Sequence, residues 1–148
     1  MRFKIRQESS AVTTAINKLG SRATNLSPAL NKFGEYRRRR HLSILNREVS
    51  PYDEPHAPLQ PATIERKRKK SADLRILHET LRLRNSFEVQ VRRKSITWSY
   101  GAPYAKYHVS GTARMPKRSP VEDERGLARR DATRLKRTTI DHILDRGL

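Results

Sequence analysis

Two runs of basic residues are the side chains in this sequence whose type and spacing most clearly suggest a function. The first run is Arg37, Arg38, Arg39 and Arg40, and the second is Arg66, Lys67, Arg68, Lys69 and Lys70. One such run is typical of a solvated helix face, whereas two runs in a small domain favour contact with a polyanion or with an acidic protein surface. We therefore treat both runs as candidate electrostatic interfaces.

Residues that could perform catalysis do not form a recognisable arrangement. The five histidines are His41, His56, His78, His108 and His142, and none lies at a metal-ligand spacing such as H-E-x-x-H. His108 could in principle act as a general base, but a packed structural histidine is the stronger interpretation. The sequence has no G-x-S-x-G turn, no glycine loop that could bind phosphate and no cysteine. We expect no enzymatic activity, no metal and no cofactor.

The composition limits the kind of protein further. The chain has 148 residues, with 33 Lys and Arg against 15 Asp and Glu, and a formal net charge of +18 that is spread along the whole sequence. A hydrophobic content of 34% predicts one domain with a small core. No stretch approaches the roughly 20 apolar residues of a spanning helix, and no signal-peptide pattern is visible. The sequence predicts a soluble, intracellular protein without membrane contact, whose partners are nucleic acid, an acidic surface or neighbours in an assembly.

Hydrophobic spacing predicts a short strand and two helices in the N-terminal third. Phe3 and Ile5 alternate with basic residues, as in a half-exposed strand. Ser9 and Ser10 can cap a first helix, whose apolar stripe is Val12, Ile16, Leu19 and Ala23.

The second helix is predicted from Ser27 at its N-cap and Pro28 at its first position. Its apolar residues are Leu30, Phe33, Ile44 and Leu45. The four arginines lie between these residues, so we expect the helix to keep one side in solvent.

The rest of the chain predicts an α+β fold. Three prolines make residues 50–60 an extended loop, and a further helix starts near Pro61. Alternating apolar residues over 87–91 and 96–100 predict a β-hairpin that turns at Arg93 and Lys94. A short helix over 103–110 ends at Gly111, residues 115–120 are irregular, and a final helix covers 127–144.

This organisation predicts one domain over residues 1–120 and a C-terminal helical arm over residues 121–148. Within the domain we expect N-terminal helices over 9–47, the loop over 50–60 and a small antiparallel sheet that includes the hairpin over 87–100.

Four stretches, in this order, resemble motifs of the bacteriophage virion morphogenesis, or tail completion, family. Residues 50–67 are similar to its "P-y-G-x-x-W-x-P-L-x-x-x-T-x-x-x-K" stretch, and residues 76–87 to "L-x-x-T-G-x-L-x-x-S". Residues 100–111 follow its "G-x-x-x-Y-A-x-x-H-x-x-G" pattern, and residues 115–118 its "x-P-x-R" segment. The matching residues are Leu59, Thr63, Lys67, Thr80, Leu83, Ser86, Gly101, Tyr104, Ala105, His108, Gly111, Pro116 and Arg118.

The chain departs from the family pattern at several positions. His56 replaces the usual Trp, and Asp53 and Leu81 stand where the family usually has Gly. Ser119 and Pro120 replace an aromatic residue and Leu that often follow the last motif.

The resemblance implies a structural virion protein at the neck or the head-proximal end of the tail. Such proteins form homo-oligomeric rings, commonly of six copies, that join the tail to the head and contact adjacent neck, connector and tail proteins. The resemblance therefore implies location in the virion, and in the host cytoplasm during assembly. The basic runs would face acidic protein or packaged DNA, and Tyr104, His108 and Arg118 would act as fold or interface determinants.

An alternative remains from the charge alone. A small basic protein could bind DNA or RNA through phosphate contacts, in which case its affinity would fall steeply with rising salt. The sequence contains no recognised nucleic-acid-binding motif.

Overall fold

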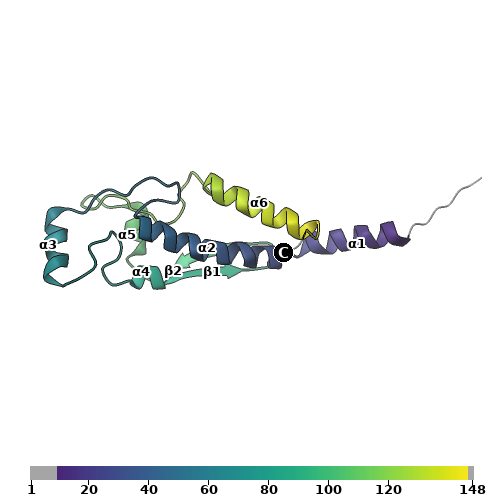
Figure 1. Ribbon diagram of the computed structural model, residues 1–148, viewed down its shortest axis with the longest axis horizontal. Coiled ribbons are helices and arrows are strands. Elements are labelled where there is room, and N and C mark those ends of the chain that lie inside the picture. Colours follow the sequence, from purple (N-terminus) through teal and green to yellow (C-terminus); the bar gives the residue numbers. More distant parts are fainter. Residues whose placement is uncertain (1–9, 147–148) are drawn as a thin grey trace, which may run out of the picture.

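The long helix α2 (Ser27–Arg47) is the element on which α6 and the strand β1 pack, in a computed structural model that describes residues 10–146. Figure 1 shows α6 along one side of α2 and the β1–β2 hairpin along the other, with α1 extending beyond one end and α3 at the opposite end. The elements are α1 (Ser10–Thr24), α2, α3 (Pro61–Lys69), α4 (Arg82–Asn85), β1 (Phe87–Val91), β2 (Ile96–Tyr100), α5 (Ala105–Ser110) and α6 (Arg129–Ile143). The predicted α+β class is confirmed.

One face of α2 forms the centre of the core. Its buried apolar residues are Ala29, Leu30, Phe33, Ile44 and Leu45. The helix starts one residue earlier than the sequence indicated, because Leu26 occupies the N-cap. The prediction that Ser27 caps the helix is therefore wrong. Instead, the Asn25 side chain accepts a hydrogen bond from the backbone N–H of Ser27 (3.2 Å), because its carbonyl oxygen reaches the free amide there.

The hairpin forms with the strands that the alternation predicted. The pairs on its apolar face are Phe87 with Tyr100, Val89 with Trp98, and Val91 with Ile96. At the turn, the backbone N–H of Arg92 donates to the Ser95 carbonyl (2.8 Å), which leaves Arg93 and Lys94 at the tip, as expected. Two strands alone are marginally stable in water, so this pair depends on the helix that covers it.

Gly34 allows α2 to lie close to the hairpin. A Cβ atom at this position would be 3.1 Å from Val89 Cγ1 and 3.5 Å from Ile96 Cδ1, so even alanine would require the Val89 side chain to shift. The close approach explains a glycine inside a long helix, where it otherwise costs stability.

His41 fixes the other end of the hairpin to α2. Its ring stacks on Phe87 with 4.0 Å between centroids, and its Nδ1 lies 3.1 Å from the Tyr100 hydroxyl. Burial, with a smaller contribution from the charge of Arg37, lowers the pKa of His41 to about 4. The imidazole is therefore neutral near pH 7 and acts as a packed structural residue.

Two departures from the family motifs keep the backbone geometry that glycine favours. Asp53 and Leu81 have φ values of 62° and 56°, in the left-handed region. Asp tolerates this region comparatively well, whereas for other side chains it costs about 1–2 kcal/mol. Gly111 also has a positive φ (75°), and a Cβ there would lie 3.0 Å from the backbone nitrogen of Lys117. Asp53 and Leu81 thus adopt the left-handed conformation although neither is glycine.

The C-terminal end of α6 meets the end of α1 and the residues that lead into α2. His142 Nε2 on α6 lies 2.8 Å from the Asn25 carbonyl, and Arg22 forms an ion pair with Asp145 (2.7 Å). The helix of the predicted C-terminal arm thus packs on the body, while the division of the chain at residue 120 stays a prediction. The predicted strand at Phe3 and Ile5 lies outside the described residues.

The left-handed conformation of Leu81 predicts an unusual order of stabilities. Leu81→Gly and Leu81→Ala both remove the side chain, but only glycine also relieves the backbone strain. We expect the Gly variant to exceed the Ala variant by about 1 kcal/mol in free energy of unfolding, measured with urea. An Ala variant more stable than the Gly variant, as in an ordinary helix, would contradict this conformation.

Candidate functional site

The first basic run divides between the core and the surface. Arg37 and Arg40 are buried, with 1% and 5% of their surface exposed, whereas Arg38 and Arg39 are exposed. Arg37 follows Phe33 by four positions and Arg40 precedes Ile44 by four, so these two arginines share the apolar face of α2. This spacing is visible in the sequence, although four consecutive arginines predict a single charged patch.

Arg37 binds three separate parts of the chain. Its guanidinium forms a hydrogen-bonded ion pair with the buried Asp131 of α6 and lies 2.8 Å from both carboxylate oxygens of Glu122. It also lies over the Trp98 ring of β2, 4.6 Å from the ring centroid. Burial raises the pKa of Glu122, which the charge of Arg37 opposes. Arg37 therefore serves the packing of α6 and the hairpin on α2.

Two neighbours complete this buried cluster. Tyr36 donates a hydrogen bond to Asp131, and burial followed by that contact raises the pKa of Tyr36 to about 12. Arg40 donates to the Pro51 carbonyl (3.1 Å) and to Asp53 (3.0 Å), which fixes the loop after α2. Asp53 comes from the loop directly after α2, whereas Glu122 and Asp131 come from parts of the chain far from α2 in sequence.

The second basic run is also divided. Lys67 is buried, and its Nζ donates to the carbonyls of Asp73 and Arg75, both at 2.7 Å. Arg66 makes two hydrogen bonds to Glu79 (2.9 and 2.8 Å), and Lys70 lies 3.7 Å from the same carboxylate. Arg68 and Lys69 are exposed. Lys67 thus holds the chain that follows α3.

The structure brings four separate motif stretches together around one groove between α3, α4 and α5, with a cavity of about 410 Å³. The motif residues that line it are Leu59, Thr63, Lys67, Thr80, Leu83, Tyr104, His108, Pro116 and Arg118. We call this cavity the motif groove. The motifs identified these residues one by one, but the order of motifs along a chain does not show that they share a cavity. The motifs missed six other residues of the lining: Gln60, Ile76, Leu77, Glu79, Arg114 and Met115.

Three further motif residues, Ser86, Gly101 and Ala105, do not line the cavity but connect the elements around it. Ser86 Oγ accepts the backbone N–H of Ala102 (3.2 Å), and the Gly101 N–H donates to the Ser86 carbonyl (3.0 Å). Ala105 packs with Leu83 in the small core cluster below the cavity. These contacts join α4 to the segment after β2.

Arg118 organises the rim near the histidines. Its Nε and Nη2 donate to the carbonyls of Ala57 (2.8 Å) and Pro58 (2.7 Å), so it anchors the proline-rich loop. Burial, and then the charge of Arg118, lowers the pKa of both His56 and His108. The His108 ring meets Tyr104 edge-on at 5.9 Å between centroids. Both imidazoles therefore favour the neutral form.

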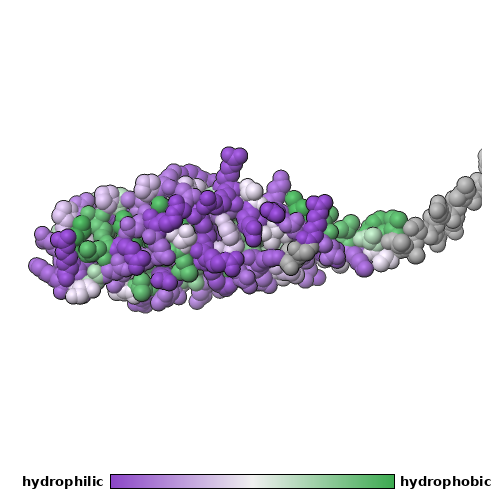
Figure 2. Space-filling model, in the orientation of Figure 1, coloured by the Kyte–Doolittle hydropathy of each residue, from purple (hydrophilic) through white to green (hydrophobic). Residues whose placement is uncertain are grey.

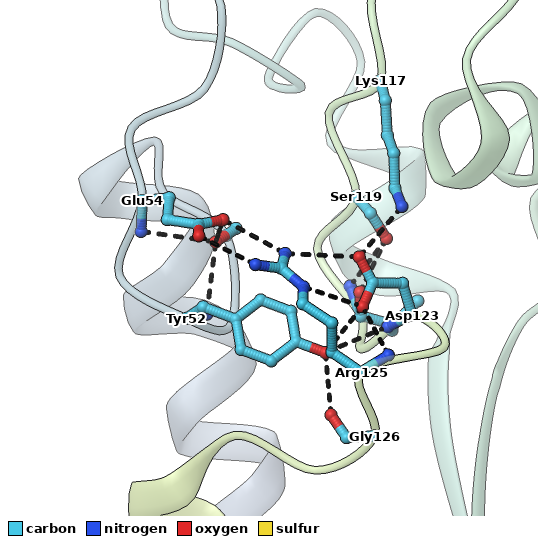
Figure 3. A network of polar contacts seen from close by, with 9 residues as sticks. Tyr52, Glu54, Lys117, Ser119, Asp123, Arg125 and Gly126 are labelled. Atoms are coloured by element: carbon cyan, nitrogen blue, oxygen red, sulfur yellow. Dashed lines mark hydrogen bonds and ion pairs between the residues drawn. The ribbon is translucent and has the colours of Figure 1, made fainter.

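A second polar cluster joins the loop after α2 to the segment before α6. Figure 3 shows the Arg125 guanidinium between Glu54 and Asp123, stacked on the Tyr52 ring at 3.7 Å from its centroid. The Tyr52 hydroxyl lies 2.9 Å from Asp123 and 2.7 Å from the Gly126 carbonyl. Hydrogen bonds from Arg125 keep the pKa of Asp123 well below its usual range. These carboxylates are engaged as structural partners.

The motif groove is suited to binding. Its walls combine apolar side chains with several cations, which is the usual composition of a ligand or peptide site. Within residues 10–146, no group of three His, Asp or Glu side chains is placed to hold a metal ion. None of the helices described is long and apolar enough to span a membrane.

The buried ion pair gives a stability prediction. Asp131→Asn leaves Arg37 in the core with Glu122 as its remaining carboxylate, and we expect a loss of about 3 kcal/mol in the free energy of unfolding. Asp145→Asn breaks the exposed pair with Arg22 and should cost at most about 1 kcal/mol. Urea titrations of both variants measure the difference, and equal losses would contradict the structural role given to Arg37.

Comparison with known proteins gives one match. The model of a family described as the phage virion morphogenesis family matches residues 7–144 and so covers the motif groove and the elements around it. Neither the curated proteins nor the solved structures yield a match.

Proposed function

The chain belongs to the phage virion morphogenesis family, and from this premise we propose that it forms a homo-oligomeric ring at the neck of a tailed phage. Membership of the family supports a structural or assembly role in the phage particle. The ring, its expected six copies and its position between head and tail are the finer part of the proposal. Adjacent neck, connector and tail proteins would be its partners.

The observation that carries this proposal is the position of α1. The helix extends beyond the body (Figure 1), and Ile16 and Leu19 on its apolar stripe are 61% and 39% exposed. An amphipathic helix in a soluble domain ordinarily buries such a stripe. In a ring, the same stripe can pack on the next copy, because a head-to-tail contact repeats until the ring closes.

The exposed basic residues support contact with a strongly acidic neighbour. Arg38, Arg39, Arg68 and Lys69 all face solvent, and α6 adds Arg134 and Arg137 on its exposed face. Packaged DNA is the second candidate for this contact, because phosphate binding needs exposed cations rather than a shaped cavity. Arg37, Arg40 and Lys67 are buried and do not contribute to that surface.

Complementation of a phage that lacks this gene tests the proposal. We expect the deletion to give DNA-filled heads and complete tails that remain unjoined in electron micrographs. The wild-type chain should restore joined particles, whereas a chain with Ile16→Asp and Leu19→Asp should not, because an apolar interface does not accommodate unpaired carboxylates.

Asn17→Asp is the matched control, since Asn17 is an exposed polar residue of the same helix. It should complement as well as the wild-type chain, and circular dichroism should show that all variants fold. Full complementation by the Ile16 and Leu19 variant would overturn the role of α1. Joined particles in the deletion phage would overturn the neck assignment itself.

A further inference from the structure

We propose that the motif groove binds a short peptide segment, acidic and apolar in sequence, that belongs to a different protein of the particle. The proposal rests on three features of this cavity: its apolar floor, the excess of cations around it, and the strained backbone along one edge. It depends on the proposed function only for the source of the peptide.

The floor of the groove is apolar and large enough for side chains of a ligand. Leu59, Ile76, Leu77, Leu83 and Met115 line it together with the Tyr104 ring. The volume of about 410 Å³ lies within the range of small-ligand sites. Figure 2 shows apolar side chains, in green, gathered among hydrophilic ones at the end of the molecule that carries α3.

The net positive charge of the groove favours a negatively charged ligand. Four cations, Arg66, Lys67, Arg114 and Arg118, line it against one carboxylate, Glu79. Arg66 neutralises Glu79 through two hydrogen bonds, and Lys67 and Arg118 donate to backbone carbonyls that do not cancel their charge.

Arg114 is the cation of the groove that is available to a ligand. It is exposed, and its guanidinium makes no hydrogen bond or ion pair with another residue in 10–146. A carboxylate of a bound peptide can therefore pair with Arg114 while a neighbouring apolar side chain enters the cavity.

One edge of the groove is formed by a strained segment. Leu77 and Leu81 both have left-handed backbone conformations (φ 64° and 56°), and the residues between them include Glu79 and Thr80, which line the cavity. Strain of this kind concentrates at binding sites and persists only where surrounding contacts hold the backbone. This wall of the groove is therefore held in position before a ligand arrives.

The positive charge of the groove argues against α1 of a second copy as the occupant. The projecting helix α1 carries Lys18 and Arg22 and no acidic residue, so inserting it into the groove of another copy would bring like charges together. The apolar floor favours a peptide over nucleic acid, because phosphates gain nothing from contact with leucine side chains. An acidic segment of another protein fits both the floor and the charge.

The test is a titration of the isotopically labelled, full-length chain followed by NMR. The probes are the capped pentapeptides Ac-Leu-Glu-Leu-Glu-Leu-NH2 and Ac-Leu-Gln-Leu-Gln-Leu-NH2, which differ only in charge. We expect the acidic peptide to shift the amide signals of residues 76–83 and 114–115 and to bind about tenfold more tightly than the neutral peptide.

Two variants check the contacts. Arg114→Gln should weaken binding of the acidic peptide by about fivefold. Arg93→Gln is the matched control, because Arg93 is exposed at the tip of the hairpin, outside the groove, and should leave the affinity unchanged.

Several results would overturn the inference. They are equal binding of the two peptides, shifts outside the groove, no binding at millimolar peptide, tighter binding of a peptide of residues 10–24, and displacement of the acidic peptide from the groove by a 16-base-pair DNA duplex. Tighter binding of the peptide of residues 10–24 would assign the groove to a second copy, and displacement by the DNA duplex would assign it to nucleic acid. Binding of the 10–24 peptide would also make the groove the site that receives α1 of the next copy in the ring. The other results leave the ring untouched, because the ring is tested by complementation with the α1 variants.

Discussion

A guanidinium buried on the apolar face of the longest helix is the constraint on which this structure depends. Arg37 cannot remain there without opposite charge, because an unpaired buried ion is far more costly than the packing around it can offset. The chain supplies Asp131 from α6 and Glu122 from the segment before it, and Trp98 covers the group from the hairpin. Satisfying one charge therefore fixes α6 and the hairpin on opposite sides of α2.

The same constraint explains how so basic a chain keeps a small core. Part of its positive charge points inward and is used for structure, as Arg37, Arg40 and Lys67 show. What remains outside is a surface rich in Arg and Lys and two apolar features, α1 and the motif groove, at opposite ends of an elongated molecule (Figure 1). A subunit with separate contact surfaces at its two ends is suited to assembly between neighbours.

The sequence predicted the local structure better than the site. Alternation gave both strands of the hairpin, and Pro61 and Gly111 marked helix boundaries, because these signals are local. The role of Arg37 depended on Asp131, 94 positions away, and no local pattern reports such a contact. The motifs identified individual residues of the groove, but the cavity itself forms only when four distant stretches fold together.

A cryo-electron microscopy reconstruction of the junction between head and tail tests the account most directly. The account predicts a closed ring of this chain in which α6 and the hairpin flank α2, the Ile16 and Leu19 face of α1 is buried against the neighbouring copy, and density from another protein fills the motif groove. A junction that lacks this chain, or a ring in which that face of α1 remains in solvent, would contradict it.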